Sequence, residues 1–221
     1  MTYNKIKKAM KRDSVQTALM IGIIVLVVFA LWFGSQAILG TDYPALAVAS
    51  GSMCITQHMG CDGFSRPFDR TLHVGDLIIV QGVDPALISD SYPNSDIIVF
   101  HKPTNTEELI VHRVVKKEEI NGTIYFRTKG DANGNHKWPE IPNSSEYDSW
   151  LIPQNMVVGR VVMRVPWVGH LALFMRNSLG IYVIIAIVLI LIIVEFAAPA
   201  FKKKPINTEA PLGNSDEGSA T

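Results

Sequence analysis

Two serines separated by one residue have the spacing for nucleophilic chemistry. Ser50 and Ser52 flank Gly51 just beyond a long apolar run, and the glycine allows the chain to turn tightly there. In one interpretation Ser52 is a nucleophile, and its backbone N–H and the Ser50 hydroxyl bind a developing oxyanion. The alternative is a polar turn that leads into a strand. A Ser-Gly-Ser sequence by itself does not decide between the two.

A serine nucleophile needs a base, because its hydroxyl group is a weak nucleophile at neutral pH. Of the six histidines, His112 has the most suitable surroundings, since it lies in the β-rich stretch Leu109–Val115. Alternation along a strand turns His112 to the face opposite Val111 and Arg113. We therefore predict His112 as the base. A histidine that merely packs on the strand is the alternative.

A base of this kind works best with a carboxylate that fixes its tautomer and stabilises the imidazolium. Asp148 precedes a β-rich sequence, which gives a positioning acid rigid support. Asp131 lies among Gly and Asn residues that suit a turn. We predict that Asp148 faces His112 and that Asp131 mainly holds the turn, although Asp131, Glu140 and Glu146 remain alternatives for the acid.

Two long apolar runs stand on either side of these residues. The run Thr17–Leu39 has no charge, and about 23 residues at 1.5 Å each give roughly 35 Å, enough to cross a bilayer. The second run is Leu179–Phe201. Lysines and an arginine precede the first run and lysines follow the second, which predicts that both ends are cytoplasmic. The predicted organisation is a basic N-terminus at 1–16, membrane helices at 17–39 and 179–201, an extracytoplasmic domain at 40–178, and a disordered tail at 202–221.

The central domain is predicted to be mainly β. Short β-rich runs alternate with Gly, Pro and Asn residues, and no sustained helical period is present. This pattern favours an antiparallel β-barrel or sandwich between the two transmembrane helices. The predicted strands are Leu77–Val80, Ile97–Phe100, Leu109–Val111, Thr123–Phe126 and Val157–Val165.

Together these sequences resemble one known family. The serine turn, the run Val111–Val114 around His112 and the block Lys129–Asn133 around Asp131 follow one another as in the type I signal peptidases. The archaeal and endoplasmic-reticulum branch is the more similar, because the bacterial branch has a lysine where His112 stands. The resemblance covers roughly residues 45 to 170.

The resemblance implies a membrane-bound serine endopeptidase that cleaves N-terminal signal peptides from exported preproteins after a small residue. It implies catalytic roles for Ser52 and His112 with Asp148 or Asp131, and an oxyanion site at Ser50 and Ser52. The expected partners are preproteins, membrane lipid and the protein-export translocon, and the expected location is the cell membrane. No metal or organic cofactor is expected, since no metal-ligand spacing or phosphate loop is present.

The sequence departs from the family pattern in two places. Cys54 follows the serine turn, and about fifteen further residues precede Leu72; Cys54 and Cys61 either form a disulfide or remain free thiols. No acid occurs at positions 134–138, so residues 134–147 are read as a longer loop.

Other functions are weighed against this one. The formal net charge is zero, which gives no electrostatic reason to expect nucleic acid binding. One rival is a non-enzymatic membrane-anchored binding domain, in which the serine turn has no chemistry. The other is a related serine peptidase that processes pilin-like or other surface proteins. Asn121 and Asn143 begin glycan sequons, and such short patterns leave their use open.

Overall fold

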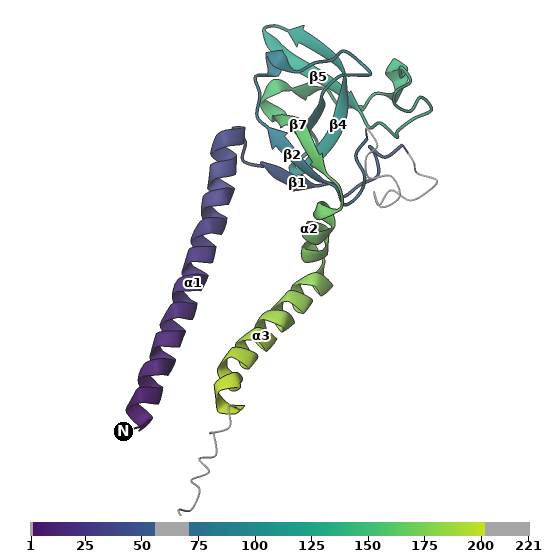
Figure 1. Cartoon of the computed structure of the whole chain (residues 1–221). Helices are drawn as coiled ribbons and strands as arrows, with labels where there is room; N and C mark the ends of the chain where they lie inside the picture. The colour runs from purple at the N-terminus through teal and green to yellow at the C-terminus, as the bar shows by residue number, and fades with distance from the viewer. Residues whose placement is uncertain (1, 56–70, 202–221) are drawn as a thin grey trace, which may run out of the picture. The chain divides into compact units, whose positions relative to one another are not determined.

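The computed structural model describes residues 2–55 and 71–201, in a chain that divides into two compact units at residues 174 and 175. The first unit contains the helix α1 (Thr2–Leu39), a β-sheet and most of the short helix α2 (Val168–Arg176). The second contains the helix α3 (Ser178–Phe201). Figure 1 shows α1 and α3 as long helices and the sheet as the part of the first unit that follows α1.

Helix α1 supplies an apolar segment of membrane-spanning length. Within the described residues, Val15–Leu39 is the helix that is long and apolar enough by itself to cross a bilayer. Helices α2 and α3 pass the same test only when they are taken together as one broken span. The predicted N-terminal membrane helix therefore has a counterpart in α1, whereas a second crossing is not shown. The predicted disordered tail at 202–221 lies outside the described residues.

Seven antiparallel strands form one sheet, as predicted for a mainly β domain. Their order across the sheet is β1-β2-β7-β3-β4-β5-β6. No pairing joins the two edge strands in the described part of the chain, so the sheet is open and the closed form of the predicted barrel is not found. The strands are β1 (Ala45–Ala47), β2 (Leu77–Gln81), β3 (Ile97–Lys102), β4 (Asn105–Ile120), β5 (Thr123–Lys129), β6 (Ile152–Pro153) and β7 (Val157–Val165).

The structure extends the predicted strands and adds new elements. All five predicted strands are present, and β7 has the predicted bounds. Strand β4 is far longer than the predicted Leu109–Val111, because its charged end pairs with β5 without an apolar pattern to signal it. Strands β1 and β6 were not predicted. The domain also contains short helices that were not predicted, namely α2 and the 3₁₀ helices η2 (Pro85–Leu87), η3 (Ser144–Glu146) and η4 (Gln154–Met156).

The middle of the sheet is buried on both faces. On β3, Val99 belongs to one apolar cluster, while Ile98 and Phe100 belong to another, as alternation along a strand requires. All three side chains are fully buried. Because β4 pairs with β3 here, with His112 opposite Ile98, the predicted base lies beside the strand that is buried on both faces.

Candidate active site

The structure brings Ser52 and His112 together from segments far apart in the sequence. Ser52 lies in the turn after β1, and His112 lies within β4. The Ser52 hydroxyl oxygen is 3.0 Å from His112 Nε2. The Ser50 hydroxyl oxygen is 3.3 Å from that of Ser52. Ser52 is half-buried and Ser50 is exposed, so the hydroxyl pair borders solvent at a position that a peptide can reach.

The other imidazole nitrogen faces Asp148. His112 Nδ1 lies 2.6 Å from Asp148 Oδ2, and the two side chains are only 8% and 10% exposed. A carboxylate accepts hydrogen bonds, so Nδ1 carries the proton and donates it to Asp148. Nε2 is then unprotonated in the neutral ring and accepts the Ser52 hydroxyl. This is the arrangement that general-base activation of a serine requires.

The Asp131 carboxylate does not bond His112. It binds Arg113, the residue that follows His112 on β4. Arg113 Nε and Nη2 each donate to Asp131 at 2.8 Å in a two-pronged pair. Both side chains are buried. Burial raises the pKa of the Asp131 carboxyl, and the bonds from Arg113 oppose that rise. The backbone of Asp131 takes part in the predicted turn, since its carbonyl accepts the Trp138 N–H at 2.9 Å. Its carboxylate, however, holds Arg113 rather than capping the turn.

A close backbone approach joins the serine turn to this second turn. The Ala132 N–H donates to the Ser52 carbonyl at 2.9 Å. A side chain at Gly130 would place its Cβ 2.5 Å from that same carbonyl oxygen. Only glycine allows this contact without displacing Ser52. The Lys-Gly-Asp block thus supports the position of the nucleophile.

Comparison with known proteins finds relatives among signal peptidase subunits. The human signal peptidase complex catalytic subunit SEC11C is 30% identical over 179 residues, which cover 79% of each chain. The mouse protein of the same name is 29% identical over the same length, and the SEC11 subunit of Chaetomium globosum is 27% identical over 156 residues, 71% of this chain and 77% of that one. The chain belongs to the type I signal peptidase family. No protein-family model matches it. The relatives are of the endoplasmic-reticulum type, as the histidine in place of lysine predicts.

The loop in which this signal peptidase departs from the family pattern is folded onto itself. The Glu146 carboxylate accepts the Asn135 N–H at 2.9 Å and lies 3.1 Å from His136 Nδ1. Burial acts to raise the pKa of Glu146, but these hydrogen bonds outweigh it and leave the pKa lowered. Glu146 is therefore engaged with the loop and not with His112, and Glu140 is exposed.

Lys129 fastens the same loop to β5. Its ammonium group is buried and donates to the His136 carbonyl at 2.7 Å. Burial lowers the pKa of Lys129, while the carboxylates of Glu146 and Asp131 act in the opposite direction. Lys129 and Glu146 together fix the path of the loop that leads to Asp148.

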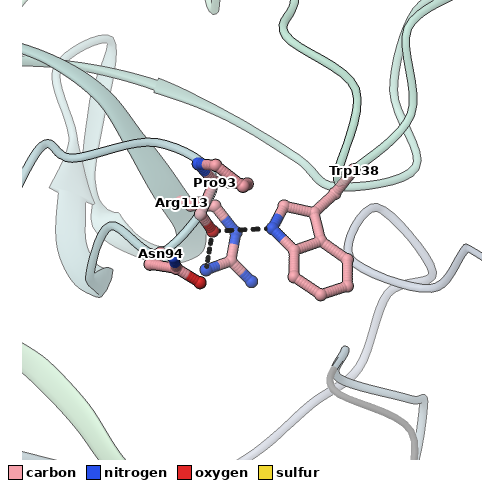
Figure 2. Close-up of a pocket in the computed structure, with 4 residues that line it drawn as sticks. All are labelled: Pro93, Asn94, Arg113 and Trp138. Carbon is pink, nitrogen blue, oxygen red and sulfur yellow. Dashed lines mark hydrogen bonds between the residues drawn. The ribbon is translucent and has the colours of Figure 1, made fainter.

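A hollow of about 310 Å³ lies beside the Arg113–Asp131 pair. Figure 2 shows its lining, in which the Arg113 guanidinium lies over the Trp138 ring, 5.0 Å from its centre, with Pro93 and Asn94 beside them. Pro93 accepts a bond from the Trp138 indole at 2.8 Å. None of the three residues of the serine–histidine–aspartate chain lines this hollow. The hollow therefore belongs to the surroundings of the Arg113–Asp131 ion pair.

Two further expectations concern cysteines and metals. Cys54 is fully buried and bonded in a disulfide. Cys61, its predicted partner, lies outside the described residues, so this pairing stays a prediction. Among residues 2–55 and 71–201, no cluster of three His, Cys, Asp or Glu residues has the geometry to hold a metal ion.

Sequence reasoning gave no role to two residues that the structure places at the site. Arg113 was read only as part of the histidine block, yet it is the partner of Asp131. Thr128, which is fully buried on β5, donates its hydroxyl to Asp148 Oδ2 at 2.6 Å. The alternation of Phe126 and Thr128 on one face of β5 was the available signal, since it predicts an inward hydroxyl.

Proposed function

We propose that Ser52, His112 and Asp148 are the catalytic triad with which this signal peptidase cleaves N-terminal signal peptides from exported preproteins. Signal peptide cleavage by a serine hydrolase follows from membership of the family. The assignment to particular residues rests on one observation, the unbroken line of hydrogen bonds from Ser52 through His112 to Asp148.

The geometry supports a two-step acyl transfer. Ser52 Oγ attacks the carbonyl carbon after a small residue while His112 Nε2 takes the hydroxyl proton. Asp148 holds the ring in the correct tautomer and stabilises the imidazolium that forms. The oxyanion is bound by the Ser52 N–H and the Ser50 hydroxyl, which is already 3.3 Å from Ser52 Oγ. His112 then gives its proton to the leaving amine, and water hydrolyses the acyl-enzyme by the same route in reverse.

The membrane arrangement is also part of the proposal. Helix α1 is the first crossing, the apolar run Leu179–Phe201 is the second, and both termini are cytoplasmic because lysines flank the runs on that side. The boundaries proposed above from the sequence, with the peptidase domain at residues 40–178 and the tail at 202–221, follow from this arrangement. Ser52 lies thirteen positions beyond Leu39, so the nucleophile stays near the outer surface of the cell membrane. A preprotein whose signal sequence is in the bilayer, delivered by the export translocon, presents its cleavage site at this depth. Membrane lipid is a partner for the same reason.

Cleavage of a preprotein by the purified full chain in lipid tests the activity and its nucleophile. The wild-type protein is expected to release a mature product whose new N-terminus follows a small residue, and Ser52→Ala is expected to release none. The matched control is Ser91→Ala, an exposed serine outside the triad, which should cleave at the wild-type rate. Equal rates for Ser52→Ala and the wild type would refute the assignment.

A protease added to intact cells tests the topology. Tags at both termini should stay protected while the central domain is cut. Digestion of a tag at the C-terminal end from outside would show that the second crossing is wrongly assigned.

A further inference from the structure

One oxygen of Asp148 receives two short hydrogen bonds. His112 Nδ1 and the Thr128 hydroxyl each lie 2.6 Å from Asp148 Oδ2. We propose that Thr128 is a positioning residue that holds this oxygen on the imidazole. The proposal rests on the triad proposed above, and it assigns to the triad a fourth member.

The sheet places the Thr128 hydroxyl on the same face as His112. Thr128 on β5 pairs directly with Val114 on β4, and His112 is two positions from Val114 on that strand. Residues that pair directly, and residues two apart on a strand, share a face. Thr128 is fully buried, with no exposed surface from which water can replace its hydroxyl. The donor to Asp148 is therefore built into the sheet.

Thr128 holds Asp148 at two points. Besides the hydroxyl bond, the Thr128 carbonyl accepts the Asp148 N–H at 2.8 Å. Asp148 itself follows a loop whose only regular element in the described residues is η3, so no strand or helix of its own fixes the carboxylate. Lys129 and Glu146 fasten earlier parts of that loop, at His136 and Asn135. Thr128 alone among these residues bonds the carboxylate oxygen that meets His112.

The hydroxyl also has an electrostatic effect. A donor to a carboxylate favours its charged form and makes it a weaker proton acceptor. With the Thr128 hydroxyl removed, Asp148 Oδ2 accepts from His112 Nδ1 alone, and the strength of that hydrogen bond should change. No charged group besides Asp148 bonds His112 in the described residues; Arg113 and Lys129, which neighbour His112 and Thr128 in sequence, bond Asp131 and the His136 carbonyl.

The test compares Thr128→Val, which keeps the shape and removes the hydroxyl, with Thr128→Ser, which restores it. Thr128→Val should lower kcat about tenfold with KM unchanged, because an orienting bond acts on the chemical step. Thr128→Ser should stay within about twofold of the wild type. The ¹H NMR signal of the proton that His112 Nδ1 donates to Asp148, which needs no substrate, should shift in Thr128→Val and stay near its wild-type position in Thr128→Ser. Melting temperatures are measured first, and Thr128→Ala replaces the valine variant should valine not fold.

Two controls separate positioning from general damage. Thr123→Val changes the same residue type about 16 Å away along β5 and should leave both kcat and the NMR signal of the His112 Nδ1 proton unchanged. In an Asp148→Asn background, Thr128→Val should cost less than about twofold, because its effect passes through Asp148. An unmoved signal of the His112 Nδ1 proton, or a full tenfold loss in the Asp148→Asn background, would overturn the proposal. Failure of the wild type to cleave preproteins would instead overturn the proposed function, and the NMR signal of the His112 Nδ1 proton would still decide the role of Thr128.

Discussion

Replacing Asp131 by asparagine separates the structural carboxylate from the catalytic one. The change removes the negative charge that two nitrogen atoms of Arg113 share at 2.8 Å. Arg113 also donates to the Ser95 carbonyl at 2.9 Å and lies over the Trp138 ring, so it cannot leave for solvent without breaking those contacts. The variant therefore keeps a buried guanidinium without its counter-charge.

The size of the effect follows from that burial. Arg113 and Asp131 side chains are 7% and 1% exposed, and breaking such a pair by removing one partner costs about 3–5 kcal/mol. The asparagine oxygen can still accept one of the two bonds, so we expect a loss of about 3 kcal/mol in unfolding free energy. For a domain of this size that loss corresponds to a fall in Tm of about 10 °C. Well below its Tm, the variant should keep activity within about tenfold of the wild type, since Asp131 does not touch His112.

Thermal unfolding and preprotein cleavage, measured on the same preparations, check both parts. Asp42→Asn is the matched control, because Asp42 is exposed and its loss should leave Tm unchanged. An unchanged Tm for Asp131→Asn would refute the argument from burial. A normal Tm with activity lost by orders of magnitude would show that Asp131, and not Asp148, serves the base.

Three other predictions follow from particular contacts. Asp148→Asn should fold normally and lose about 10³–10⁴ in kcat, measured by preprotein cleavage, because the amide favours the wrong imidazole tautomer; a loss under tenfold would contradict this. Gly130→Ala should lower activity by at least about a hundredfold with the fold kept by circular dichroism, because its Cβ displaces the Ser52 carbonyl; wild-type cleavage would show that the contact is not needed. Burial is the main cause that raises the pKa of Tyr92 to about 12, and the negative charge of Asp131 is the second. The folded state therefore favours the protonated phenol. The stability that this provides is complete below about pH 10 and is lost as the pH rises toward 12. Ultraviolet titration should show one tyrosine that ionises late, and Tyr92→Phe should remove it. Six tyrosines that titrate together near pH 10 would refute this prediction.

Much of the site could be predicted from the sequence because it depends on local patterns. The apolar strand around His112 and the Ser-Gly-Ser turn each have a signature that a short stretch of residues carries. The family order of these blocks then indicated that they meet. The choice of Asp148 as the acid that faces His112 came from the strand sequence that follows it, and the structure places it there.

The rest depends on contacts that no short pattern encodes. Arg113 and Asp131 are 18 positions apart, and only the pairing of β4 with β5 brings them together. The length of β4 was missed because its charged half is paired without being apolar. The open sheet edge and the short strands β1 and β6 depend on register, which side-chain periodicity does not specify for strands of two or three residues.

The coupling between Ser52 and His112 tests the central claim most directly. Cleavage rates of one preprotein are compared for Ser52→Ala, His112→Ala and the double variant, in lipid and at one pH. Residues that act as one unit lose almost all activity at the first substitution, so the double variant should be no slower than either single variant. Losses that multiply in the double variant, or a His112→Ala protein that cleaves at nearly the wild-type rate, would contradict the proposed catalytic triad.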